Sequence, residues 1–177
     1  MQGGFSPPFF IMEKLWSPWR SQYIDSFKDK TPKTGCFLCD CSKLDVDHAG
    51  NLLIYKGEQT FITLNLYPYN NGHLMIVPYN HKPDFLSLST EENAEIMHLL
   101  KLSVKALDEV MKPEGYNIGV NLGKAAGAGV DDHVHFHVVP RWNGDTNFMP
   151  VLGEVKVISQ DLHLTKTNLL AAFRKLI

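Results

Sequence analysis

The pattern of apolar and polar positions predicts short strands grouped around one long helix. Apolar and β-branched runs predict five strands, at residues 52–55, 60–64, 73–78, 116–121 and 133–139. The first three runs are separated only by Gly57 and by the turn-forming sequence YPYNNG, as is typical of adjacent antiparallel strands.

The longest periodic segment predicts a helix that begins near Ser89. The sequence Ser-Thr-Glu-Glu at 89–92 has the form of a capping box. Apolar residues then recur at spacings of three and four, at Ile96, Leu99, Leu100, Val104, Leu107 and Met111. Pro113 and Gly115 are expected to end this helix, and residues 165–177 predict a second, amphipathic one. We therefore expect an α+β fold with a mainly antiparallel five-stranded sheet, one long helix and a C-terminal helix.

Composition and charge narrow the class of protein. The chain has 177 residues, of which 44% are hydrophobic and 20% charged, which suits one globular domain and not a disordered chain. The formal net charge of −2 supplies no general attraction to nucleic acid or to an anionic membrane. No apolar run approaches the roughly 20 residues of a membrane span, so we expect neither nucleic acid nor membrane as a partner.

We interpret residues 1–35 as an N-terminal tail and an aromatic-rich segment that precede a domain at 36–177. The N-terminal sequence MQGGFSPPFFIM lacks a basic leading region and is broken by prolines, so we do not interpret it as a signal peptide. The aromatic-rich stretch EKLWSPWRSQYI, at 13–24, is expected to pack against the domain. With no export signal, and with three clustered cysteines that suit a reducing compartment, the predicted location is the cytoplasm.

The sequence DDHVHFHVVPRW, at 131–142, contains three histidines at alternate positions. Alternation in a strand puts His133, His135 and His137 on one face, about 6.6 Å apart per step. The residues between them are expected to face the core: Val134, Phe136 and Val138. A single buried histidine is commonly a packed core residue, but three in alternation cost desolvation that apolar residues avoid. The row therefore indicates function.

Two kinds of chemistry fit the histidine row. Neutral imidazoles bind zinc, and two histidines two positions apart can share one ion, with Asp131 as a nearby carboxylate. Alternatively, an imidazole with an ordinary pKa of about 6.5 is mostly neutral in the cell and can attack a phosphorus atom while its neighbours donate to phosphate oxygens.

The surrounding sequence favours phosphate. The predicted strand 116–121 ends in Asn121, and the following loop, LGKAAGAGVDD, is rich in small residues that let backbone N–H groups approach an anion. Lys124 and Arg141 would add positive charge. Together with the histidine row, these residues predict a phosphate-binding site.

Several motifs resemble those of the histidine triad (HIT) family of nucleotide hydrolases and transferases. HVHFHVV has the family's His-φ-His-φ-His-φ-φ form, where φ is apolar, and residues 61–81 resemble its earlier strand pair with Gly-His-x-Leu-φ-φ-Pro-x-x-His. LWSPWRSQYI followed by Cys-x-x-Cys, and HVVPRWNGDTNFMP, are similar to a bacterial branch of diadenosine polyphosphate phosphorylases. The resemblance spans most of residues 15–150. It implies a HIT-like fold whose sheet extends across a homodimer.

The resemblance also implies roles for individual residues. His135 would be the nucleophile that takes up a nucleoside monophosphate, His137 would contact the transferred phosphate, and His73 would back the site. Asn65 would bind the ribose, and Asn121 would lie near the phosphate.

One departure from the family pattern concerns the segment before the triad. Relatives often carry Gly-Gln-Ser there, whereas this chain reads AGAGVDDH, so backbone donors of Ala128 and Gly129 are expected to substitute. The implied activity is cleavage of a dinucleoside polyphosphate through a nucleotidyl–His135 intermediate, completed by phosphate or water. A nucleoside phosphoramidate hydrolase, or a zinc-stabilised nucleotide-binding module without activity, are the alternatives.

The cysteines point to a second site. Cys36, Cys39 and Cys41 lie too close together for a disulfide framework. Cys36 and Cys39 are either buried apolar residues or half of a tetrahedral zinc site, with Cys41 a rival ligand. The resemblance implies the missing ligands, His81 and His133, and hence a structural zinc ion with no open position.

Overall fold

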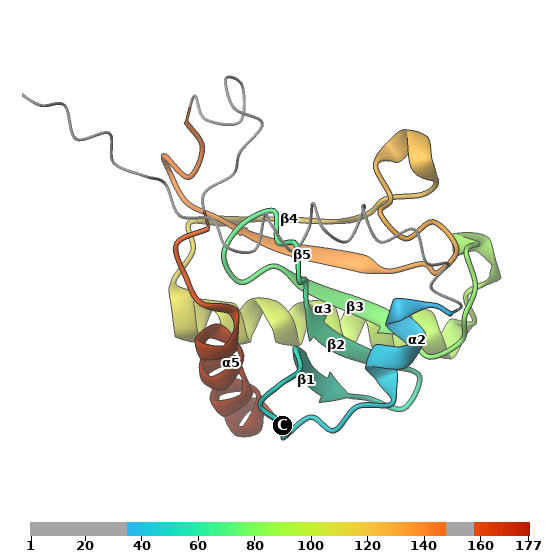
Figure 1. The fold of residues 1–177 in the computed structure, drawn as a ribbon, viewed down its shortest axis with the longest axis horizontal. Coiled ribbons are helices and arrows are strands. Elements are labelled where there is room, and N and C mark those ends of the chain that lie inside the picture. Colours follow the sequence, from blue (N-terminus) through green and yellow to red (C-terminus); the bar gives the residue numbers. More distant parts are fainter. Residues whose placement is uncertain (1–34, 148–157) are drawn as a thin grey trace, which may run out of the picture. The chain divides into compact units, whose positions relative to one another are not determined.

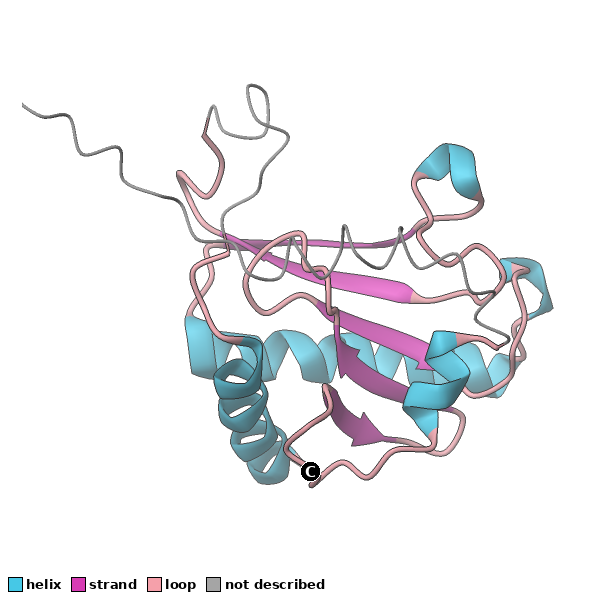
Figure 2. Cartoon of the chain, in the orientation of Figure 1, coloured by secondary structure: helices cyan, strands magenta, loops and turns pink. Residues whose placement is uncertain are grey.

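The computed structural model describes residues 35–147 and 158–177, and the expectation for the aromatic lead-in lies outside them. Five antiparallel strands form one sheet in the order β1-β2-β3-β5-β4 (Figures 1 and 2). The strands are β1 Leu53–Lys56, β2 Thr60–Leu64, β3 Leu74–Pro78, β4 Gly115–Val120 and β5 Phe136–Arg141. The predicted α+β class and the five predicted strands are confirmed.

The fifth strand begins later than predicted. It starts at Phe136, so the first two histidines of the row lie in the segment that leads into it. β5 pairs with β3 only as far as Phe136, and the N–H of Val134 donates instead to the carbonyl of Lys82, in the loop after β3. The alternation still holds, because Val134 and Val138 are buried in the core.

Three helices accompany the sheet in the described ranges: α2 Phe37–Ser42, α3 Thr90–Met111 and α5 Leu162–Leu176. The capping box of Ser89 and Glu92 is present, which confirms the predicted start of α3. α5 begins three residues earlier than predicted because the Asp161 side chain accepts from the N–H of Leu164 and caps it. α2 was not predicted. None of these helices is long and apolar enough to cross a membrane.

Apolar side chains fill both faces of the central strands. α3 and α5 pack on one face, over a core that includes Ile62, Ile76 and Leu107 (Figure 1). On the other face, Leu38 of α2 packs in a second cluster with Phe61. Burial on both faces explains why the sequences TFITL and LMIVP are apolar with little alternation.

The turn between β1 and β2 is held by a carboxylate of α3. Glu95 accepts the backbone N–H groups of Glu58 and Gln59, each at 2.7 Å, and the Thr60 hydroxyl at 2.8 Å. Burial alone would raise the pKa of Glu95, but these hydrogen bonds hold it below its usual value.

Glu95→Gln is expected to lower the free energy of unfolding at neutral pH by about 1–2 kcal/mol, because an amide cannot accept all three bonds. The folded-state pKa of Glu95 is depressed, so its contribution is present above the unfolded-state pKa and is lost as the pH falls through the folded-state value. Urea unfolding at neutral and at strongly acidic pH checks this. A difference between variant and wild type that persists unchanged in acid would contradict it.

Candidate functional site

His73, just before β3, and His137, in β5, form a hydrogen-bonded pair. The backbone N–H of Tyr69 donates to Nδ1 of His73 at 3.0 Å, so this nitrogen carries no proton. The proton of neutral His73 therefore lies on Nε2, which donates to Nδ1 of His137 at 2.9 Å. His137 must in turn carry its proton on Nε2. The chain of bonds thus leaves His137 with an N–H donor on its outer nitrogen.

His135 has the opposite tautomer. Its Nδ1 lies 2.9 Å from the carbonyl oxygen of His133, and a carbonyl can only accept, so Nδ1 carries the proton. The Nε2 lone pair of His135 is consequently free. The rings of His135 and His137 meet edge to face, with centroids 4.8 Å apart. An unprotonated ring nitrogen of His135 therefore lies beside a ring that carries an outward N–H donor.

The exposure of the three histidines, and the pKa values of His73 and His137, agree with these tautomers. His135 and His137 each keep 6% of their surface exposed, whereas His73 keeps none, so only the first two can meet a bound molecule. Burial, followed by the charges that His137 and His135 would carry, lowers the pKa of His73 to about 3. Burial and then His135 lower the pKa of His137 to about 4. Both rings are therefore neutral at physiological pH.

Long-range ¹H–¹⁵N correlation spectra are expected to show His73 and His137 as Nε2–H tautomers and His135 as the Nδ1–H tautomer. His73 and His137 should remain neutral at about pH 5, where an ordinary histidine is charged. Their folded-state pKa values lie below 6.5, so the unfolded chain binds more protons and stability declines as the pH falls from 6.5 towards 4. An imidazolium signal for His73 at about pH 5 would contradict this assignment.

Two of the predicted substrate-binding residues lie at these histidines. Nδ2 of Asn65 is 3.3 Å from Nδ1 of His73. The side-chain amide of Asn121, just beyond the end of β4, comes within 3.5 Å of Nε2 of His137. The structure therefore brings together residues from three separate segments of the sequence.

Tyr69 also belongs to the site, although sequence reasoning treated its segment only as a turn. Its ring centroid lies 4.6 Å from that of His73 and 5.5 Å from that of His137. Its hydroxyl accepts from Nδ2 of Asn121 at 3.4 Å. The available signal was an aromatic residue four positions before His73, inside a turn that brings its backbone N–H to the ring.

The other predicted substrate-binding residues have different partners. Lys124 is exposed and pairs with Asp131 at 3.5 Å. The Arg141 guanidinium binds Asp145 through Nε and Nη2, at 2.6 and 2.7 Å, and lies four residues beyond His137, about 13 Å along β5.

The loop before the triad offers fewer donors than expected. The N–H of Ala128 donates to the carbonyl of Gly123 at 3.3 Å and is therefore engaged. Gly129 is exposed in the same loop. Phosphate binding by these two residues stays a prediction.

Four side chains from distant segments converge on a candidate metal site. They are Cys36 and Cys39 at α2, His81 after β3 and His133 before β5, and their ligand atoms all lie within 4.8 Å of one another. Nδ1 of His133 is 3.3 Å from the Cys36 sulfur and 3.6 Å from the Cys39 sulfur. Tetrahedral zinc with bonds of about 2.3 Å to sulfur and about 2.0 Å to nitrogen requires ligand atoms roughly 3.5 Å apart, so the donor set fits such an ion.

The hydrogen bond of His133 suits metal binding. Nε2 of His133 donates to the Pro78 carbonyl at 2.9 Å, which leaves the Nδ1 lone pair directed at the sulfurs. Burial lowers the pKa of His133, which favours its neutral form. Nε2 of His81 lies 3.8 Å from the Asp132 carboxylate, while its Nδ1 lies 3.4 Å from the Cys39 sulfur. Cys41 is outside the cluster and donates to the Thr63 hydroxyl.

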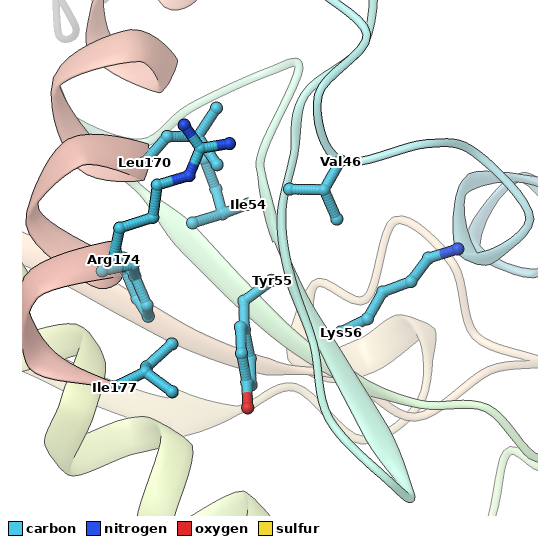
Figure 3. Close-up of a pocket in the computed structure, with 8 residues that line it drawn as sticks. Val46, Ile54, Tyr55, Lys56, Leu170, Arg174 and Ile177 are labelled. Carbon is cyan, nitrogen blue, oxygen red and sulfur yellow. The ribbon is translucent and has the colours of Figure 1, made fainter.

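A pocket of about 420 Å³ lies elsewhere, between β1 and α5. Figure 3 shows Leu170 and Arg174 of the helix, with Ile177 just beyond its end, facing Ile54 and Tyr55 of the strand. Among the residues that the structure describes, none that lines this pocket is a histidine or a cysteine. We therefore assign the candidate chemistry to the histidines and not to this pocket.

Comparisons with known proteins agree with the geometry. The HIT domain family model matches residues 48–144. AP-4-A phosphorylase of Mycobacterium tuberculosis is 37% identical over 160 residues, which cover 88% of this chain and 81% of that protein. Adenosine 5'-monophosphoramidase of Schizosaccharomyces pombe is 33% identical over 111 residues, covering 61% of this chain and 75% of that protein.

A solved structure with the same fold contains zinc. It is described as a Zn-bound histidine triad family protein from Mycobacterium smegmatis, and it superposes with a TM-score of 0.63 and 28% identity. The match covers 80% of this chain and 95% of that chain. By its sequence, its fold and its arrangement of histidines, the chain belongs to the histidine triad (HIT) family.

Proposed function

We propose that the protein cleaves a dinucleoside polyphosphate through a nucleotidyl intermediate on His135. The chain is a HIT-type nucleotide hydrolase or transferase. The observation that carries the proposal is the bond from Nδ1 of His135 to the His133 carbonyl, which leaves Nε2 with a free lone pair. Similarity to an AP-4-A phosphorylase over most of the chain supports the substrate class.

The chemistry follows from the tautomers. Nε2 of His135 attacks the phosphorus of a nucleoside monophosphate unit, and the bond from that phosphorus to the bridging oxygen breaks. Nε2–H of His137 donates to an oxygen of the reacting phosphate and stabilises the charge that develops on it. An oxygen of inorganic phosphate or of water then attacks the same phosphorus and releases His135. When inorganic phosphate attacks, the released product is a nucleoside diphosphate. When water attacks, it is a nucleoside monophosphate.

Product analysis of diadenosine tetraphosphate incubations, with and without inorganic phosphate, tests the proposal. Formation of ADP with ATP, only when phosphate is present, identifies phosphorolysis, whereas AMP with ATP identifies hydrolysis. Absence of turnover in both incubations would contradict the proposal. Adenosine phosphoramidate is the second substrate to compare by kcat/KM, because of the similarity to an adenosine 5'-monophosphoramidase.

Zinc is the metal that we assign to Cys36, Cys39, His81 and His133. Two thiolates and two imidazoles at tetrahedral spacing are typical of structural zinc sites, and a relative with this fold is Zn-bound. All four ligands come from the protein, so the ion would leave no position for water. Its contribution would be to hold α2 against the segment that carries the triad.

A homodimer formed through β4 is the assembly that we propose. β4 is an edge strand of the sheet, and three of its six residues are exposed, including Ile118 with 48% of its surface accessible. Leu122, just beyond the strand, is equally exposed. Such an edge can pair with a second copy. Ile118→Lys is expected to convert the dimer into a monomer in light scattering, and a monomeric wild type would contradict the proposal.

A further inference from the structure

We infer that Glu92, in the first turn of α3, is a positioning residue for both histidine ligands of the metal site. This inference rests on the zinc site proposed above. Glu92 is charged and yet only 1% exposed. Its Oε1 accepts from Nδ2 of Asn80 at 2.9 Å, and its Oε2 accepts from Nζ of Lys82 at 2.9 Å. One carboxylate therefore holds the residue before His81 and the residue after it.

His81 depends on such tethers because of where it lies. It is exposed and follows the end of β3 at Pro78, beyond the ladder that pairs β3 with its neighbours. A surface segment without ladder bonds is free to move unless side chains fix it. The bonds from Glu92 to Asn80 and Lys82 fix the backbone on both sides of His81, and therefore the direction in which its ring points.

The same tether reaches the second histidine ligand. The carbonyl of Lys82 accepts the N–H of Val134 at 2.8 Å, and Val134 is adjacent to His133. The rings of His81 and His133 meet edge to face, with centroids 5.0 Å apart. Glu92 thus sets the spacing of the two imidazoles through Lys82.

Capping of α3 does not by itself account for this arrangement. In the capping box, Oε2 of Glu92 accepts the N–H of Ser89 at 2.7 Å, and glutamine can make the same bond. A neutral side chain would avoid the cost of burying a charge, which is tolerated only because Lys82 and Asn80 bind it. The buried charge therefore indicates a role beyond the cap, directed at the segment that carries His81.

The test is Glu92→Gln in the full-length protein, because this change keeps the cap and removes the ion pair. Zinc affinity is measured by competition with a chromophoric chelator, and the ligand set by the absorption spectrum of the Co²⁺-substituted protein. We expect zinc binding to weaken at least about tenfold. The Co²⁺ spectrum should shift towards that of His81→Ala, which lacks the ligand outright.

Glu95→Gln is the matched control, because it is the same substitution one turn further along α3 and its bonds go to the β1–β2 turn. It should destabilise the fold while zinc affinity and the Co²⁺ spectrum stay as in the wild type. Equal zinc affinities in Glu92→Gln and the wild type, or equal losses in Glu92→Gln and Glu95→Gln, would overturn the inference. If Glu92→Gln does not fold, Asn80→Ala removes one tether at the surface and should weaken zinc binding at least about threefold.

Zinc binding by the wild-type protein distinguishes failure of the proposed zinc site from failure of the positioning role of Glu92. A wild type that binds no zinc refutes the metal site, and with it the role of Glu92. The other result to distinguish is a wild type that binds one zinc ion. If Glu92→Gln and Asn80→Ala then bind zinc as tightly as the wild type does, only the positioning role is refuted.

Discussion

Replacing His135 with alanine is expected to lower kcat/KM for diadenosine tetraphosphate at least about 10⁴-fold. The change removes the nitrogen that we propose attacks phosphorus, and neither His133 nor His137 can replace it. Nδ1 of His137 is occupied by the proton of His73, and His133 directs its free nitrogen at the cysteines. The effect is measured by steady-state product formation with and without phosphate.

A matched control and a direct probe accompany this variant. His98→Ala removes an exposed histidine on α3 and should leave turnover unchanged. Substrate labelled at the α-phosphate should transfer label to wild-type protein, in an acid-labile bond, and none to His135→Ala. Near-normal turnover in His135→Ala would eliminate the mechanism.

Removal of the metal by chelation, or by Cys36→Ser, is expected to lower the melting temperature by roughly 10 °C or more. A structural zinc site contributes several kcal/mol to folding, and about 1 kcal/mol corresponds to roughly 2–4 °C in a chain of this size. The helix α2 has six residues, too few to be stable alone. Its Leu38 should leave the second core cluster once the cysteines are released. Calorimetry with and without chelator checks this.

Cys41→Ala is the control for the cysteine substitution, since Cys41 is buried but lies outside the metal cluster. This variant should still bind one zinc ion per chain. Activity should fall together with metal loss in Cys36→Ser, because the segment that carries His133 also orients His135. A chelator that strips zinc without moving the melting temperature would contradict the structural role.

Much of the architecture was predictable because it depends on local pattern. The period of α3 and its capping box reflect interactions within a few residues, and so do the apolar runs of the sheet. The late start of β5 was not predictable, because it depends on Val134 pairing with Lys82, 52 positions away in the sequence. The short α2 carries Cys39 and follows directly on Cys36, and it offers no periodic signal.

Within the candidate site, residue types were predictable and tautomers were not. The histidine spacing indicated chemistry, and the family resemblance indicated which histidine would do what. The tautomers follow from partners such as the Tyr69 N–H and the His133 carbonyl, which only the folded chain reveals. Arg141 was predicted at the phosphate because of its charge; in the folded chain it pairs with Asp145, four residues later, and its binding of phosphate stays a prediction. The sequence alone does not identify the group with which a charged side chain pairs in the folded chain.

The carbonyl of His133 has an implication for how this fold can diverge. This carbonyl belongs to the main chain and is present whatever side chain occupies position 133. The tautomer of His135 therefore does not depend on the identity of that side chain. A lineage could exchange all four metal-binding residues for well-packed apolar ones and still keep its reactive nitrogen. Metal binding and reactivity are therefore separable only where apolar packing holds the segment that carries His133 in the place that the ion would otherwise fix.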